Sequence, residues 1–233
     1  MIKVIDYNNL GGADHGWLKA KHHFSFASYQ DPNRVRFGPM RVINDDIVAP
    51  KKGFDPHPHD NMEIITYVRK GAITHKDDMG NQGRTEAGDV QVMSAGTGVV
   101  HSEYNLEDEH TNLYQIWMFP NKKNVKPRWD AKKFPKEPVE GKLKPLVTGF
   151  ENNDSESLKI YQDVIVYAGR VNKGKSVNQS IEKDQAYVLC SQGKIKIDDT
   201  EIKKGDGAEI TDLKNVNITS LEDSEILFID LPR

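Results

Sequence analysis

Cysteine is almost absent from this sequence, and so are long apolar runs. Cys190 is the single cysteine among 233 residues. One cysteine excludes an intramolecular disulfide and the thiol-rich zinc sites, which need several cysteines. No stretch reaches the ~18 apolar residues of a membrane span, and the first residues have no apolar signal core of ~7–15 residues. We therefore expect a cytoplasmic protein without membrane contact, in which Cys190 is a buried structural thiol.

An excess of charge of one sign is also missing. The chain has 32 lysines and arginines against 35 aspartates and glutamates, which gives a formal net charge of −3. This balance excludes nucleic-acid binding through bulk charge. Basic residues cluster at 121–145, but prolines and acidic residues interrupt them, and this composition is typical of a solvated linker.

Signals for long helices are scarce, whereas signals for short strands are frequent. The 11 prolines and 18 glycines are spread along the chain and often flank short apolar segments. These segments are rich in β-branched and aromatic residues, which favour strands. The sequence therefore predicts an all-β protein, with strands at 41–43, 64–68, 90–93, 113–119, 159–161, 164–167, 186–190, 194–197 and 226–229.

A faint internal repeat links the two halves. Gly71–Thr74 followed by Gly88–Val90 is similar to Gly193–Lys196 followed by Gly205–Gly207. In each copy a strand-turn-strand unit leads to a Gly-Asp turn, which indicates duplication of one antiparallel β-barrel. We expect two barrel domains in one chain, with an N-terminal barrel at 1–120, a linker at 121–145 and a C-terminal barrel at 146–233.

Histidine is absent after residue 110, so any histidine-based metal site belongs to the first barrel. His57 and His59 form a His-x-His pair, and His101 and Glu103 form a His-x-Glu pair. Residues i and i+2 of a strand point to the same face ~6.6 Å apart, so each pair can reach one ion. Two such pairs on neighbouring strands supply three imidazoles and one carboxylate. This set leaves two octahedral positions open and suits iron(II), nickel, manganese or copper.

The other histidines are interpreted as structural. His22 and His23 lie beside Phe24 and Phe26, so we expect their rings to pack against aromatic side chains and to form hydrogen bonds with the backbone. His75 lies near the turn signal at 77–81, so we expect it to be solvated.

Two long segments resemble the two cupin motifs. These segments, together with several shorter ones, resemble the pirin family, which belongs to the cupins. Gly53–Glu63, closing at Gly71, is similar to the first cupin motif, and Gly88–Asn105 is similar to the second. The pirin pattern is carried by His15-Gly16-Trp17, His23–Ala27, Tyr29, Asp31-Pro32, Arg41–Asp46, the segment with His57 and His59, Ser94–Gly98 and His101–Asn105. The resemblance is close over residues 15–119, and it covers the remainder only as a histidine-free second barrel.

The resemblance implies a bicupin with one divalent metal ion, held by His57, His59, His101 and Glu103. In the general cupin pattern the carboxylate ligand follows the His-x-His pair by four residues, which here is Glu63; the pirin pattern takes Glu103 instead. Glu63 therefore stays an alternative ligand. The metal expected is iron(II), with zinc, nickel, copper and manganese as alternatives.

The activity that the resemblance implies is that of a quercetin 2,3-dioxygenase, which cleaves a flavonol with dioxygen and releases carbon monoxide. Glu103 would then be catalytic and accept the proton of the flavonol hydroxyl. Apolar side chains for the pocket mouth are expected at Phe24, Phe26, Phe37, Met40 and Met93, although core packing explains them equally well. The alternatives are a metal-sensing regulator that binds a transcription factor or a metabolic enzyme, and another metal-dependent cupin reaction.

Overall fold

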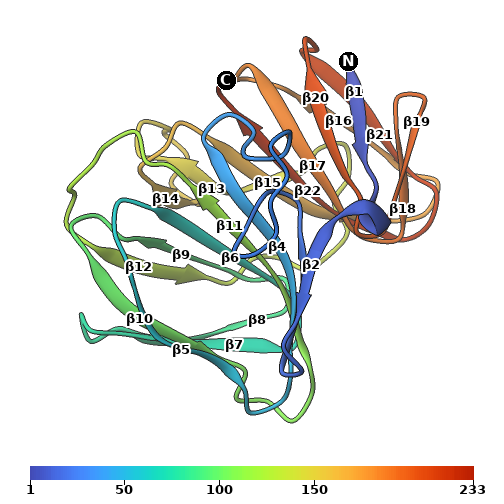
Figure 1. The fold of residues 1–233 in the computed structure, drawn as a ribbon. Helices are drawn as coiled ribbons and strands as arrows, with labels where there is room; N and C mark the ends of the chain where they lie inside the picture. The colour runs from blue at the N-terminus through green and yellow to red at the C-terminus, as the bar shows by residue number, and fades with distance from the viewer. The chain divides into compact units, whose positions relative to one another are not determined.

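The computed structural model describes residues 1–233 as a succession of β-strands, with one 3-10 turn, η1 (Tyr7–Asn9), as its only helix (Figure 1). Neighbouring strands of the sheets run antiparallel, as in the pairings of β11 with β4 and of β17 with β22. The prediction of an all-β protein is confirmed. The structure has no helix with the length and the apolar character needed to cross a membrane.

The strands form two compact units, each made of segments that are separate in the sequence. The N-terminal unit consists of Gly11–Pro135 and Leu158–Gln162. The C-terminal unit consists of Met1–Leu10, Lys136–Ser157 and Asp163–Arg233. The ranges 1–120, 121–145 and 146–233 stay a prediction of the domain boundaries, and the contacts group the chain differently.

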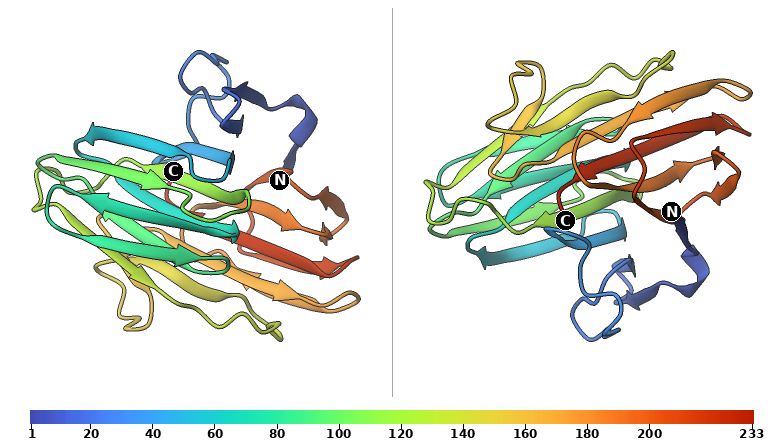
Figure 2. Two further views of the ribbon diagram at one scale, coloured as in Figure 1. Left: turned by 90° about the horizontal axis from the view of Figure 1, so that it is seen from below. Right: turned by 90° about the horizontal axis from the view of Figure 1, so that it is seen from above.

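Two strands account for part of this difference. β1 (Ile2–Ile5) pairs with β20 (Gly207–Thr211), so the first residues lie in the sheet of the C-terminal unit (Figure 2). β12 (Arg128–Lys132) lies in the segment interpreted as a linker and pairs with β9 (Val90–Ser94) of the N-terminal unit. Trp129 of β12 packs against an apolar cluster of that unit, and this contact stabilises the strand.

The N-terminal unit consists of a longer and a shorter sheet. The longer sheet has the strand order β12-β9-β6-β11-β4-β3-β2, and the shorter sheet has the order β5-β10-β7-β8. Figure 1 shows the shorter sheet below the longer one. The remaining strands of this unit are β2 (Gly11–Asp14), β3 (Leu18–His22), β4 (Met40–Val48), β5 (Gly53–His59), β6 (Glu63–Lys70), β7 (Ala72–Asp77), β8 (Gln82–Glu86), β10 (Val99–Tyr104), β11 (Thr111–Met118) and β14 (Leu158–Ile160).

The C-terminal unit repeats this arrangement. Six of its strands have the order β1-β20-β17-β22-β15-β13, and a second sheet has the order β16-β21-β18-β19. The remaining strands of this unit are β13 (Lys144–Gly149), β15 (Ile165–Val171), β16 (Ser176–Ser180), β17 (Gln185–Gln192), β18 (Lys194–Ile197), β19 (Thr200–Lys203), β21 (Asn215–Ser220) and β22 (Ser224–Leu231).

The interiors of the two units differ in chemistry. One apolar cluster in the C-terminal unit joins both sheets and includes Val188, Phe228, Ile195 and Ile218. Cys190 is fully buried in that cluster, as predicted, and forms no disulfide. Apolar contacts in the N-terminal unit include smaller separate clusters, and buried histidine, glutamine and carboxylate side chains lie in the same interior. The polar interior marks the N-terminal unit as the place for a site.

Candidate metal centre

Three histidines converge between two strands of the shorter sheet. His57 and His59 lie on β5, and His101 lies opposite His57 on β10. The ring centroids are 4.9 Å apart for His57 and His59, 4.5 Å for His57 and His101, and 5.0 Å for His59 and His101. One ring nitrogen of each lies within 4.8 Å of the other two. The structure thus brings together the three histidines that the sequence pattern singles out.

These histidines present unused ring nitrogens. The Nε2 atoms of His59 and His101 are buried and have no hydrogen-bond partner. Nδ1 of His57 lies 2.7 Å from the carbonyl oxygen of Asp55, and it must donate there because a carbonyl oxygen only accepts. Nε2 of His57 therefore keeps its lone pair in the neutral ring.

Burial keeps two of these rings neutral. Burial and the neighbouring histidines His57 and His59 lower the pKa of His101 to about 2. Burial, with His57 beside it, lowers the pKa of His59 to about 4. A buried nitrogen without a partner is costly, and a neutral imidazole is a preferred ligand of first-row divalent metals. The donor set therefore fits a metal ion.

Glu103 lies on the same strand as His101 but in a different environment. Its carboxyl group is 1% exposed and falls in one cluster with His101 and His75, rather than with His57 and His59. Burial raises its pKa to about 7, although hydrogen bonds from side chains of the longer sheet oppose this shift. A carboxyl group with this pKa can accept and release a proton near neutral pH. Its role as the fourth ligand stays a prediction.

A row of polar side chains on the longer sheet holds Glu103. Gln91 and Thr66 donate to Oε1, at 2.6 and 3.3 Å, and Gln115 donates to Oε2 at 2.7 Å. The strand registers align these three residues on β9, β6 and β11. Asn44 on β4 continues the row beside Gln115. Sequence reasoning missed this row, because a single polar residue inside an apolar strand does not indicate which partners it meets.

Glu63, the alternative ligand of the general cupin pattern, lies elsewhere. Its Oε2 accepts hydrogen bonds from Ser94 Oγ at 2.7 Å and from the backbone N–H of Tyr161 at 3.1 Å. Its Oε1 is buried without a partner. Burial raises the pKa of Glu63 to about 7. Glu63 belongs to neither cluster of metal-ligating side chains in the structure.

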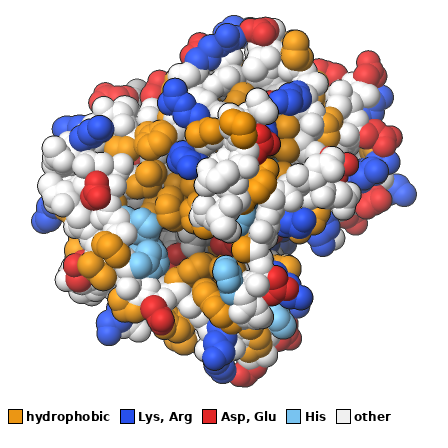
Figure 3. All heavy atoms as spheres, viewed as in Figure 1, with side chains coloured by type: hydrophobic (Ala, Val, Ile, Leu, Met, Phe, Trp, Pro, Cys, Tyr) orange, Lys and Arg blue, Asp and Glu red, His pale blue; other side chains and the backbone are white.

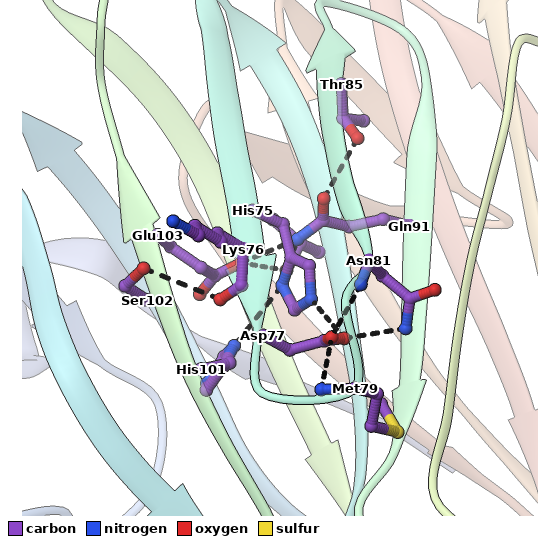
Figure 4. Close-up of polar contacts among 11 residues, drawn as sticks. His75, Lys76, Asp77, Met79, Asn81, Thr85, Gln91, His101, Ser102 and Glu103 are labelled. Carbon is purple, nitrogen blue, oxygen red and sulfur yellow. Dashed lines mark hydrogen bonds and ion pairs between the residues drawn. The ribbon is translucent and has the colours of Figure 1, made fainter.

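His75 is not solvated, and the expectation that it would be is wrong. It is fully buried on β7, which pairs with both β10 and β8, and its ring stacks on Trp129 at 4.9 Å with an interplanar angle of 7°. Nε2 lies 3.0 Å from Oδ2 of Asp77, and Nδ1 lies 3.3 Å from Nδ1 of His101 (Figure 4). The turn begins only after Asp77. The signal that could have found this pair is its i, i+2 spacing, which repeats that of the two ligand pairs.

His22 packs against aromatic side chains, as predicted. Its ring centroid lies 5.3 Å from that of Phe26 and 6.3 Å from that of Tyr29. Its Nδ1 forms a hydrogen bond of 2.8 Å with Oδ1 of Asn44, which is a side chain and not the backbone partner that was expected.

A cavity of about 630 Å³, which we call the chamber, lies beside the three histidines. His57 lines it together with the aromatic side chains of Trp17, Phe26, Phe54 and Trp117. Figure 3 shows histidine side chains at the sides of a hollow, with apolar side chains next to them. Of the five apolar residues expected at the pocket mouth, Phe26 lines the chamber. The other four, Phe24, Phe37, Met40 and Met93, do not line it.

The longer sheet contributes polar as well as apolar side chains to the chamber. Asn44, Asp46 and Gln115 line it beside Ala20 and Trp117 of the same sheet. Asp46 is 2% exposed, and its Oδ1 has no hydrogen-bond partner. Burial, with repulsion from Asp45 and Glu103, raises the pKa of Asp46 well above its ordinary value. The chamber can therefore hold a flat apolar molecule and offer hydrogen bonds to its polar substituents.

Comparison with known proteins gives matches over nearly the whole chain. The family model described as Pirin matches residues 4–118, and the one described as Quercetinase C-terminal cupin domain matches residues 148–231. A protein of Escherichia coli (strain K12) named quercetin 2,3-dioxygenase is 41% identical over 234 residues, with 100% of this chain and 99% of that protein covered. A protein of Caulobacter vibrioides named pirin-like protein is 49% identical over 231 residues, with 99% of each covered.

Solved structures agree with these matches. The crystal structure of YhhW from Escherichia coli has a TM-score of 0.93 at 39% identity and covers 100% of this chain and 98% of its own. The structure described as bacterial pirin YhhW in complex with nickel(II) has a TM-score of 0.92 at 37% identity, with 100% and 99% covered. The chain therefore belongs to the pirin family, and its fold is that of two cupin domains in one chain.

Proposed function

We propose that this protein is a metal-dependent dioxygenase that cleaves quercetin or a related flavonol with dioxygen and releases carbon monoxide. The observation that carries the proposal is the set of unused Nε2 atoms, on His57, His59 and His101, at the side of an aromatic chamber. The name of the Escherichia coli relative supports the reaction, and the nickel complex of YhhW supports a metal in this fold.

The metal would be held by His57, His59, His101 and Glu103, with iron(II) expected and zinc, nickel, copper or manganese as alternatives. A divalent ion in this position supplies a Lewis acid that lowers the pKa of a coordinated hydroxyl group. The remaining chemistry falls to the side chains around it. They bind the flavonol, orient it and take up its proton.

Glu103 is the proposed base. The O–H bond of the flavonol hydroxyl breaks, the proton passes to the carboxylate of Glu103, and the flavonolate that remains is electron-rich and reacts with dioxygen. As a carboxylate in this position, Glu103 can accept the proton and later return it to the product. The donors from Gln91 and Gln115 hold the carboxylate in one orientation.

The chamber is the proposed substrate site. Trp17, Phe54 and Trp117 offer faces and edges against which flat rings can pack. Asn44 and Asp46 can form hydrogen bonds to hydroxyl groups on those rings. A hydroxylated, planar aromatic molecule satisfies both the aromatic and the polar side chains of the chamber.

Carbon monoxide release tests the proposal. Metal-free protein is reconstituted anaerobically with iron(II) or another divalent metal, mixed with quercetin and exposed to air, while the visible absorbance of quercetin is followed. We expect metal-dependent release that is lost in His101→Ala and in the metal-free protein. Glu103→Gln should bind quercetin but turn it over at least 100-fold more slowly. No release with any metal, despite one metal per chain, would overturn the proposal and favour a metal-sensing regulator.

A further inference from the structure

Two buried side chains connect His101 to the turn that follows β7. Nε2 of His75 lies 3.0 Å from Oδ2 of Asp77, and Nδ1 of His75 lies 3.3 Å from Nδ1 of His101 (Figure 4). The side chains of His75 and Asp77 are 1% and 0% exposed. Neither residue belongs to the predicted ligand set or to the proposed reaction.

Asp77 can only accept hydrogen bonds in this arrangement. Its Oδ1 accepts from the backbone N–H groups of Met79 and Asn81 at 3.0 and 2.9 Å, and its Oδ2 accepts from Asn81 Nδ2 at 2.8 Å (Figure 4). Burial raises the pKa of Asp77, but the hydrogen bonds from His75 and Asn81 together outweigh it, and the pKa lies below its ordinary value. The group is therefore an ionised acceptor on every side.

This acceptor determines where the next two protons lie. Nε2 of His75 must donate to Asp77, so in the neutral ring Nδ1 of His75 has a lone pair. Nδ1 of His101 must then donate to that lone pair, because two unprotonated nitrogens at 3.3 Å would repel each other. The lone pair of His101 consequently lies on Nε2, the buried atom that has no partner in the structure.

We infer that Asp77 and His75 are positioning residues that hold the proton of His101 on Nδ1 and keep its Nε2 free for a metal. The proton order follows from the hydrogen bonds among these side chains; only its purpose rests on the proposed function. The flat stacking of His75 on Trp129 fixes the plane of the ring that connects the two. Outer groups that orient a metal-binding histidine typically change metal affinity 10–100-fold.

Asp77→Asn should reverse the proton order. The backbone N–H groups of Met79 and Asn81 require the amide oxygen at the position of Oδ1, which leaves the amide nitrogen facing His75. This nitrogen donates to Nε2 of His75, whose proton then lies on Nδ1 and is donated to Nδ1 of His101. The proton of His101 moves to Nε2, where it blocks coordination. Asn81 can turn its own amide group to present its oxygen.

The measurement is nitrogen-15 NMR of histidine-labelled, metal-free protein, which distinguishes the two tautomers of each ring. We expect His101 to be protonated on Nδ1 in the wild type and on Nε2 in Asp77→Asn, with at least 10-fold weaker nickel(II) binding by calorimetry. Asp78→Asn, one residue further in the same turn and exposed, is the matched control and should change neither result.

A second variant covers the case in which Asp77→Asn does not fold. His75→Phe keeps an aromatic ring against Trp129 but removes both hydrogen bonds, so His101 should populate both tautomers and bind nickel(II) 2- to 10-fold more weakly. The inference is overturned if His101 keeps its proton on Nδ1 and its nickel(II) affinity in either folded variant. A wild type that binds no metal would remove the proposed function, while the tautomer comparison would still decide the proton order.

Discussion

Two buried glutamates of the N-terminal unit share a raised pKa but not an environment. Both have a pKa of about 7 because burial disfavours the charged form. Both oxygens of Glu103 accept side-chain hydrogen bonds, whereas Oε1 of Glu63 is buried without a partner. Ionisation of either group therefore costs folding free energy, and the two sites differ in how completely hydrogen bonds hold the carboxyl group.

Glu63→Gln should remove a loss of stability that occurs as the pH rises. The folded-state pKa of about 7 lies above the ordinary 4.5, so folding retains a proton that the unfolded chain releases between pH 4.5 and 7. The free energy of unfolding of the wild type therefore falls across this window and is constant above it. Glutamine cannot ionise, so the variant should gain on the order of 3 kcal/mol relative to the wild type between pH 4.5 and 8.

Urea unfolding at a series of pH values, with metal-free protein, measures this difference. Glu109→Gln, at an exposed glutamate, is the control and should follow the wild type. Parallel curves for Glu63→Gln and the wild type would show that the pKa of Glu63 is the same in the folded and the unfolded protein.

At the scale of elements, the site depends on a register shift between β5 and β10. His101 lies opposite His57, but Glu103, two residues on, lies opposite Phe54, three residues back. This β-bulge lies at the segment that contains Pro56. Proline has no backbone N–H to donate, and it is tolerated here because β5 is the edge strand of its sheet. Alternation along single strands predicts which side chains share a face, but not a shift between two strands.

This limit explains how much the sequence could predict. The i, i+2 pairs needed only strand periodicity, and they located His57, His59 and His101 correctly beside one another. The all-β fold followed from composition and turn signals in the same way. The row of polar side chains that holds Glu103 and the position of His75 depend on which strands become neighbours. That strand pairing is determined by packing across the whole unit.

Gly53→Ala should disturb the end of β10. A Cβ atom at Gly53 would overlap the carbonyl oxygen of Glu103 and lie 2.5 Å from Cα of Tyr104, so the backbone of β10 would have to move. We expect a loss of ~1–3 kcal/mol in the free energy of unfolding, with weaker nickel(II) binding by calorimetry. Unchanged nickel(II) affinity in the folded variant would show that this strand end does not position the site.

Gly16→Ala is the matched control for this variant. Its φ of +78° makes alanine strained by ~1–2 kcal/mol, but no atom lies within 4 Å of the added carbon. It should lower stability by a similar amount and leave nickel(II) binding unchanged.

At the scale of the whole molecule, the two units divide their tasks. The histidines all lie in the N-terminal unit, and the C-terminal unit has an apolar interior without any. A ligand that binds only the folded state stabilises it by about 2.7 kcal/mol at 100 times its dissociation constant. Metal binding should therefore stabilise one unit directly.

Hydrogen exchange of the full chain, with and without nickel(II), locates this effect. We expect slower exchange in β5 and β10, which carry the proposed ligands, and unchanged exchange in β17 and β22. His101→Ala, measured in the same way, should show no difference on addition of nickel(II). Equal protection of all four strands would contradict a site confined to the N-terminal unit.

The chain enters and leaves each unit more than once, and this affects how such a gene can be divided or recombined. The C-terminal unit takes β1 from the first ten residues, and the N-terminal unit takes Leu158–Gln162 from beyond residue 157. No single break in the coding sequence yields both units complete. Truncation of the chain at any one position within it therefore leaves at least one of the two units incomplete.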